Sequence, residues 1–202
     1  TTADNCAVTL LTWALSGATT GTSAATGINN LGTFVFNVGV TTVTYTVRDA
    51  AGNTATCNYT VTVSDNIVPT ITCPSDITVN VGAGACTVSV VTPNATTADN
   101  CAVTVLTWAL SGATTGTSAA TGINNLGTQV FNLGVTTVTY TVRDAAGNTA
   151  TCNYTVTVSD NILPTITCPA NITANTDAGI CTASVVTPNP TTADNCGVTI
   201  LT

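Results

Sequence analysis

The amino-acid sequence predicts an all-β protein made of repeated domains, and three observations support this prediction. Threonine supplies 49 of the 202 residues, and β-branched side chains favour the extended backbone of a strand over a helix. Apolar and polar residues alternate with period two in several segments, as in half-buried strands. The chain also repeats itself, because residues 96–190 differ from residues 1–95 at only 12 positions. A repeat of 95 residues has the size of one β-sandwich.

The charge composition excludes several classes of function. Charged residues make up 5% of the chain, with nine Asp against two Arg, no His and a net charge of −7. A nucleic-acid surface needs several cations, so nucleic acid is not an expected partner. His, Glu and Lys, the common proton-transfer groups, are absent, and we therefore expect no enzyme and no catalytic residues. Polar residues interrupt every long apolar run, so no membrane span is expected in this segment.

Turn-forming residues suggest where one repeat ends and the next begins. Asp65 and Asp160 are each followed by Asn and, a few residues later, by a proline, between two alternating apolar runs. We therefore predict a complete domain at 65–159, with 1–64 as the C-terminal part of one repeat and 160–202 as the N-terminal part of the next. The sequence begins inside a repeat, which predicts a window from a longer array. A short linker with a proline should hold neighbouring domains semi-rigidly.

About seven strands are expected in the complete repeat, with Trp108 on the third, as in an immunoglobulin-like β-sandwich. A small closed barrel is the alternative. The run at 143–148 indicates a hairpin loop, because its Gly and Asn accept a positive φ. The expected strands cover residues 71–81, 86–91, 103–110, 128–133, 138–142 and 152–158, with a loop or weak edge strand at 111–127.

The motifs of this unit resemble those of hyalin-repeat (HYR) domains over all 95 residues. The resemblance is carried by Asp99-Asn-Cys101, by the run from Gly134 to Asn148, by Cys152-Asn-Tyr-Thr-Val156 and by Pro164-Thr-Ile-Thr-Cys-Pro169. It implies an immunoglobulin-like fold used for extracellular adhesion. With Cys86 and Cys101 added, the pattern is similar to the four-cysteine version found in very long surface proteins of Bacteroidota, some of which are gliding or biofilm adhesins.

The nine cysteines predict disulfide bonds and an oxidising, extracellular location. Zinc sites usually contain cysteine pairs two to four residues apart, and this sequence has none. Four cysteines per repeat allow three connectivities. Alternating strand directions place Cys73 and Cys152 at the same end of parallel neighbours, which favours that pair.

The remaining pair would be Cys86–Cys101, repeated as Cys181–Cys196. This pairing carries a difficulty, because the starts of the second and third strands should lie at opposite ends of the domain. It requires the loop at 93–100 to fold back along the second strand. Cys57 and Cys168 would then pair with cysteines outside the 202 residues.

Three aspartates are candidate metal ligands. Asp65, Asp99 and Asp144 should gather at the N-terminal end of the domain, each close to an asparagine. Such oxygen ligands suit Ca²⁺, which could stiffen a domain junction. The alternative, which we favour, is that these side chains form the local hydrogen bonds that turns require. No other cofactor is expected.

Threonines of the last two long strands predict a flat, hydroxyl-rich sheet face. Such a face could bind ice or glycans or pack against another filament, but we favour the simpler interpretation that it is an uncharged, soluble outer face. The residues are Thr137, Thr139, Thr141, Thr151, Thr155 and Thr157.

We predict a structural or adhesive filament, or stalk, on the cell surface. Its expected partners are neighbouring repeats of the same chain and, through lateral contacts, other filaments. The alternative is a binding module in which every repeat carries a glycan, surface or ice site and copy number supplies avidity.

Overall fold

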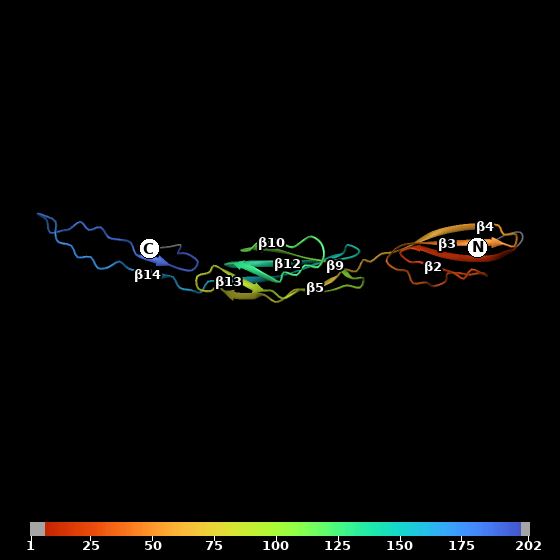
Figure 1. Cartoon of the computed structure of the whole chain (residues 1–202), viewed down its shortest axis with the longest axis horizontal. Helices are drawn as coiled ribbons and strands as arrows, with labels where there is room; N and C mark the ends of the chain where they lie inside the picture. The colour runs from red at the N-terminus through yellow and green to blue at the C-terminus, as the bar shows by residue number, and fades with distance from the viewer. Residues whose placement is uncertain (1–6, 199–202) are drawn as a thin grey trace. The chain divides into compact units, whose positions relative to one another are not determined.

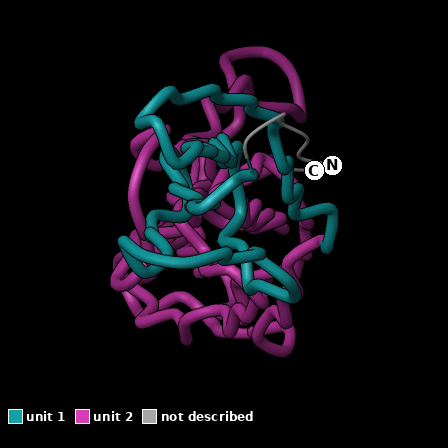
Figure 2. The backbone as a smooth tube through the Cα atoms, turned by 90° about the vertical axis from the view of Figure 1, so that its right-hand side faces the viewer, with its two compact units in different colours: residues 1–67 teal, residues 68–202 magenta. Residues whose placement is uncertain are grey.

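The computed structural model describes residues 7–198. The chain forms two compact units, residues 1–67 and residues 68–202, which are treated separately below (Figure 2). All regular structure in the described part is β-strand, as the composition predicts. Within that part, no helix is long and apolar enough to cross a membrane.

The first unit contains one antiparallel sheet (Figure 1). Its strands are β1 (Val8–Gly17), β2 (Gly21–Thr22), β3 (Gly39–Asp49) and β4 (Thr54–Val63), in the order β2-β1-β3-β4. Leu15 and Val43 are buried on this sheet. Trp13 packs edge-on against Phe34, with the ring centroids 5.6 Å apart.

The second unit contains the complete repeat, in which a five-stranded sheet faces a two-stranded one. The larger sheet has the order β10-β9-β12-β13-β6, and the smaller sheet pairs β11 with β7. A further pair, β5 with β8, lies at the start of the repeat. The bounds are β5 (Thr70–Thr72), β6 (Ile77–Asn80), β7 (Thr87–Val91), β8 (Thr96–Ala98), β9 (Val103–Gly112), β10 (Gly116–Thr117), β11 (Thr128–Asn132), β12 (Gly134–Asp144) and β13 (Thr149–Ser159).

The hydrophobic core lies between these two sheets. Phe131 of β11 is fully buried, and Val90 of β7 is nearly so. The larger sheet contributes the side chains that alternate toward them, namely Leu106, Leu110, Val138, Tyr140, Val142, Tyr154, Val156 and Val158. Alternation along β12 and β13 therefore has its expected cause, since one face of each strand packs in the core. The predicted immunoglobulin-like β-sandwich is confirmed.

The predicted first strand is divided into two short ones. β5 pairs antiparallel with β8, whereas β6 pairs parallel with β13. Pro74 lies between them, and a proline has no N–H to donate to a ladder. The chain therefore leaves one sheet and joins the other. The segment at 111–127 contains the end of β9 and the two-residue strand β10.

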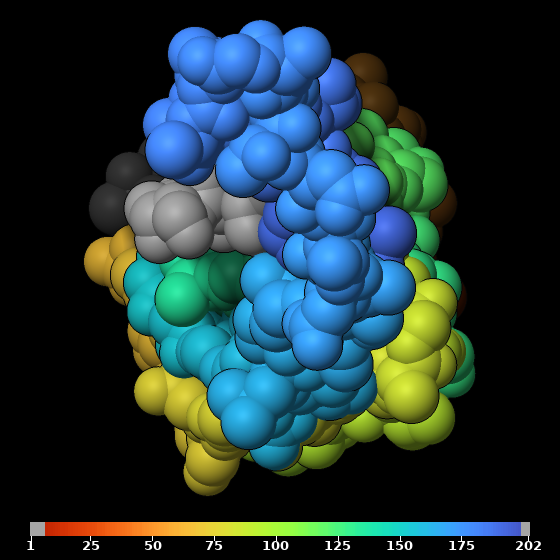
Figure 3. All heavy atoms as spheres, turned by 90° about the vertical axis from the view of Figure 1, so that its left-hand side faces the viewer, coloured from red at the N-terminus to blue at the C-terminus, as the bar shows by residue number. Residues whose placement is uncertain are grey.

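Residues 161–198 form a single short strand pair, β14 (Thr165–Thr167) with β15 (Thr191–Ala193). The chain between them has no strand and is exposed almost throughout (Figure 3). In the preceding copy the equivalent residues form β6 and β7, which pair with β13 and β11. The segments that correspond to β11 and β13 are not among the 202 residues.

Candidate functional site at the ends of the repeat

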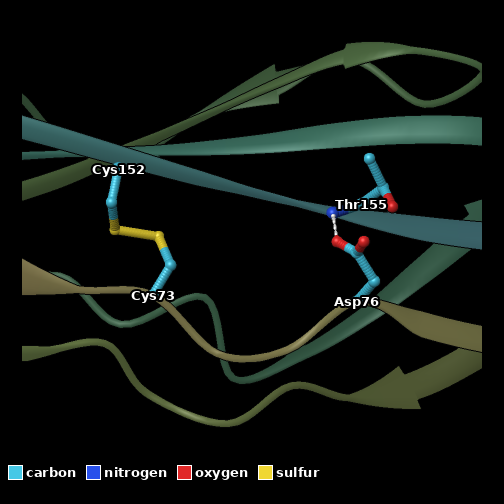
Figure 4. The surroundings of a disulfide bond; sticks show 4 residues. All are labelled: Cys73, Asp76, Cys152 and Thr155. Atoms are coloured by element: carbon cyan, nitrogen blue, oxygen red, sulfur yellow. Dashed lines mark hydrogen bonds between the residues drawn. A yellow bond between two sulfur atoms is a disulfide. The ribbon is translucent and has the colours of Figure 1, made fainter.

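A disulfide joins Cys73 to Cys152, with the two Cα atoms 5.7 Å apart (Figure 4). This is the pair that alternating strand directions favour, and its cause is the parallel pairing of β6 with β13. Asp76 strengthens the same place, because its Oδ1 accepts a hydrogen bond from the Thr155 amide at 2.7 Å. The bond and the carboxylate together hold the edge strand where its ladder begins.

The hairpin between β12 and β13 is organised by Asp144, whose side chain is only 1% exposed. Its Oδ1 accepts hydrogen bonds from the amides of Gly147 and Asn148 at 2.7 and 2.8 Å. Its Oδ2 accepts one from Asn148 Nδ2 at 2.7 Å. Burial raises the pKa of Asp144, but the bonds from Asn148 and Gly147 outweigh it and hold the pKa below its ordinary value. Asp144 thus stabilises the turn through local hydrogen bonds, as expected of an aspartate in a loop.

Asp99 lies next to Asp144 in the same unit, with carboxylate oxygens within 4.8 Å. Asp99 Oδ2 accepts a hydrogen bond from the Cys101 amide at 2.9 Å. Asp99 Oδ1 is buried and accepts no hydrogen bond from the protein. Asp65 belongs to the first unit, where its Oδ1 accepts a bond from the Ile67 amide at 3.1 Å.

The residue that follows Cys101, and its copies in the other two repeats, has a positive φ. Ala102 has φ +94° and its copy Ala7 has φ +78°, a region that L-residues with a Cβ rarely adopt. The third copy of this position is Gly197, with φ +89°. The conformation is therefore a property of the turn, and only the third copy has the residue that adopts it without strain.

The second predicted pair, Cys86–Cys101, is not formed, and neither is its copy Cys181–Cys196. Cys86 directly precedes β7, whereas Cys101 follows β8, which pairs with β5 at the start of the repeat. The difficulty noted from strand directions is therefore decisive. Cys86 instead contacts Cys196, which comes 95 residues after Cys101.

We define the repeat junction as Ala85, Cys86, Asp160, Asp194, Asn195 and Cys196. The Cys86 thiol donates a hydrogen bond to the Asn195 carbonyl at 2.9 Å, and the Cys196 thiol donates one to the Ala85 carbonyl at 3.5 Å. Asn195 Nδ2 also donates to the Ala85 carbonyl, at 3.1 Å. All these residues belong to the second unit, so the turn before β7 and the segment after β15 contact one another directly.

Two carboxylates complete the repeat junction. Asp194 Oδ2 accepts a hydrogen bond from the Cys196 amide at 3.1 Å, and Asp160 Oδ1 accepts one from the Ile162 amide at 3.0 Å. The Ile162 bond is the main cause that lowers the pKa of Asp160. A hydrogen bond with Cys86, then burial, then Asp160 raise the pKa of Cys196 to about 12.

Some oxygens at the junction have no hydrogen-bond partner in the protein. Asp194 Oδ1 and Asn195 Oδ1 are buried in this way. Asp194 is the copy of Asp99, so the same carboxylate oxygen lacks a hydrogen bond in both copies. Buried polar atoms are costly when unsatisfied, which makes this recurrence informative.

The predicted threonine face lies on the paired strands β12 and β13. Thr137 lies opposite Thr155, and Thr141 lies opposite Thr151. Thr139 instead faces Asn153, and Thr157 faces Val135. A shallow hollow borders this face and is lined by Thr139, Thr141, Thr107, Trp108 and Ser118 together with neighbouring alanines.

Cys57, Cys168 and Cys181 are exposed and form no disulfide in the described part of the chain. Cys57 is the copy of Cys152, and Cys168 is the copy of Cys73. The two positions pair with one another in the complete repeat, but Cys57 and Cys168 belong to two different repeats.

These features define a class of protein, namely tandem β-sandwich repeats with an internal disulfide and a polar contact between successive copies. The chain belongs to the HYR domain family, which matches residues 20–63 and 64–158. It is 38% identical over 174 residues to a hyalin of Lytechinus variegatus, covering 83% of this chain and 30% of that protein. It is 35% identical over 168 residues to a hyalin of Strongylocentrotus purpuratus, covering 80% and 13%. The chain thus spans less than a third of the length of these relatives.

Solved structures show weaker similarity. The fibronectin(III)-like modules of Clostridium thermocellum CbhA align with 79% of this chain and 83% of their own, at 13% identity and a TM-score of 0.35. Extracellular cadherin domains 3–6 of protocadherin gamma B2 align with 79% and 45%, at 13% identity and a TM-score of 0.32. Likenesses this remote carry no functional information.

Proposed function

We propose that this chain is part of an extracellular structural and adhesive filament, in which near-identical domains follow one another and provide reach. The observation that carries the proposal is the repeat junction, where Cys86 and Ala85 of one repeat contact Asn195 and Cys196 of the next. Domains joined only by a flexible linker would need no such contacts.

The chemistry of the chain supports this reading. The described residues contain a disulfide, which is typical of proteins in oxidising compartments, and the curated relatives are described as hyalin. The chain has no His, Lys or Glu to transfer protons, which supports a non-enzymatic role. We extend the proposal to a long cell-surface adhesin of the bacterial kind that the four-cysteine pattern resembles.

The filament proposal is tested by lengthening the chain. Copies of residues 65–159 are inserted after residue 159 of the full chain, and the maximum dimension is measured by small-angle X-ray scattering. Each copy should add a constant increment of about 40 Å, estimated from strands rising ~3.3 Å per residue plus loops. Increments that shrink as copies are added would mean that the repeats collapse on one another, and would contradict the proposal.

A second candidate function is ligand binding by every repeat, and the threonine face with its adjoining hollow favours it. Two facing Thr–Thr pairs and the partly exposed Trp108 offer hydroxyl and aromatic contacts to a sugar. Glycan arrays and thermal-hysteresis measurements on the full chain test the glycan and ice forms of this candidate. Binding that weakens on Trp108→Ala and on Trp13→Ala, its copy, and is lost when both are replaced would support it.

We further propose that Ca²⁺ binds near Asp99. Support comes from its buried Oδ1 without a hydrogen-bond partner, from the nearby Asp144 carboxylate and from the same feature at Asp194. Calcium prefers such oxygen ligands. At a concentration 100 times its dissociation constant, a ligand of the folded state stabilises by about 2.7 kcal/mol.

Melting temperature in EGTA and in millimolar CaCl₂ tests the calcium proposal. We expect Ca²⁺ to raise the melting temperature by several degrees, and Asp99→Asn to remove most of that rise. Asp177→Asn is the matched control, because Asp177 is exposed and lies outside both the junction and the Asp99 site. Identical melting curves in the two buffers would exclude the site.

A further inference from the structure

We propose that Cys86 and Cys196 form a disulfide bond that joins each repeat covalently to the next. The inference concerns the covalent structure of the chain, so it goes beyond the proposed function and holds whether or not the repeats extend a filament. It also gives a partner to Cys86, for which the predicted pairing with Cys101 conflicts with the strand directions.

The geometry is reciprocal. Each thiol donates a hydrogen bond to the carbonyl of the residue that precedes the other cysteine: Cys86 to Asn195, and Cys196 to Ala85. Cys86 is also close enough to the Cys196 thiol to raise its pKa. The two cysteines therefore lie side by side with their sulfur atoms adjacent, which is the arrangement a disulfide needs.

Both cysteines are held in place by their backbones. The Cys86 carbonyl accepts a hydrogen bond from the Leu133 amide at 3.2 Å, which ties it to the end of β11. The Cys196 amide donates to Asp194 at 3.1 Å. Cys196 also packs against the hydrophobic core of the preceding repeat. A bond between the sulfurs would therefore require little rearrangement of either segment.

The surroundings suit the oxidised form. The Ala85 carbonyl keeps a donor when the Cys196 thiol is consumed, because Asn195 Nδ2 already bonds to it at 3.1 Å. The Asp160 carboxylate likewise keeps its hydrogen bond from the Ile162 amide. The thiolate of Cys196 is disfavoured, since Cys86, burial and the Asp160 carboxylate all raise its pKa. At neutral pH the pair is accordingly a poor reactive or metal-binding thiolate site.

The repeat makes the inference general. Cys101 is the copy of Cys196, and Cys181 is the copy of Cys86. In an array, Cys101 would therefore bond to the preceding repeat and Cys181 to the following one. Every repeat would then use two cysteines within itself, as Cys73–Cys152, and two across its ends.

The oxidation needs an acceptor, which we take to be a low-molecular-weight or protein disulfide. The two S–H bonds break and one S–S bond forms, so that two protons and two electrons leave the cysteines. The acceptor disulfide takes up both and is reduced to two thiols. Oxidised glutathione performs this exchange in the test that follows.

The experiment uses the full chain with the exposed cysteines removed by Cys57→Ser, Cys168→Ser and Cys181→Ser. The folded protein is incubated with oxidised glutathione, alkylated, digested with pepsin without reduction and examined by mass spectrometry. We expect a peptide that links Cys86 to Cys196, in addition to the one that links Cys73 to Cys152. A peptide linking Cys86 to Cys101, or alkylated Cys86 and Cys196 beside an intact Cys73–Cys152 peptide, would overturn the proposal.

Matched variants control for folding. Cys86→Ser should leave Cys196 open to alkylation, and Cys196→Ser should do the same for Cys86. Cys101→Ser should not affect the Cys86–Cys196 peptide. The Cys73–Cys152 peptide and the far-ultraviolet circular dichroism report on the fold in every variant. If Cys101→Ser abolished the Cys86–Cys196 peptide while both fold markers stayed unchanged, the assignment would be wrong. Scattering increments for the lengthened chain test the filament proposal separately.

Discussion

Replacing Cys73 and Cys152 together by alanine is expected to lower the free energy of unfolding of the complete repeat by about 4 kcal/mol. The two cysteines are 79 residues apart in sequence, so the bond closes a long loop in the unfolded chain. The double substitution avoids leaving an unpaired thiol in the partly buried site. The Asp76–Thr155 hydrogen bond remains, and it should keep β6 in register with β13.

The measurement is urea denaturation followed by tryptophan fluorescence. A Trp13→Phe background leaves Trp108 as the only tryptophan, so the signal reports the complete repeat. Cys57→Ala is the matched control, because Cys57 is the exposed copy of Cys152 and forms no disulfide. A double variant that loses less than about 1 kcal/mol would show that the bond does not constrain the unfolded chain as the loop-entropy relation supposes.

Local pattern was enough to predict most of the fold. Period-two alternation located β12 and β13, because side chains such as Val138 and Tyr140 are buried between two sheets while their neighbours are not. Strand direction then favoured the Cys73–Cys152 pair. These features depend on residues close in sequence or on the simplest up-and-down order of strands.

The features that sequence missed depend on contacts between distant segments. Pro74 gave a local signal for the break between β5 and β6, but the change of sheet depends on β8 and β13, which lie far along the chain. The Cys86–Cys196 contact was missed because pairing was considered within one repeat. The signal that could have revealed it was present, because the fixed period places Cys196, the copy of Cys101, in the next repeat.

The candidate metal site shows the same limit. Sequence placed Asp99 and Asp144 at one end of the domain, and they do lie together. The favoured interpretation, local turn hydrogen bonds, describes Asp144, which accepts bonds from the amides of its own loop, but it did not reveal that Asp99 keeps a buried oxygen without a hydrogen bond. The difference between the two carboxylates depends on the exact course of the backbone, which cannot be predicted from residue type.

Gly112→Ala is expected to destabilise the complete repeat by about 3 kcal/mol, from a positive φ and a steric clash together. Gly112 ends β9 with φ +100°, and a Cβ there would collide with the carbonyl oxygen of Val135 on β12. The backbone cannot retreat, because that carbonyl also accepts a hydrogen bond from the Ala113 amide at 2.9 Å. The first unit repeats the arrangement at Gly17, which approaches the Val40 carbonyl in the same way.

Gly122→Ala separates the two causes. Gly122 has φ +78° but nothing within 4 Å of a Cβ, so its replacement costs only the backbone strain, about 1 kcal/mol. Both variants are compared by the same urea denaturation in the Trp13→Phe background. A loss at Gly112 clearly larger than that at Gly122 assigns the difference to the approach of β9 to β12. Equal losses would mean that the strands separate without cost, and the tight packing at this end of the sheet would then contribute nothing to stability.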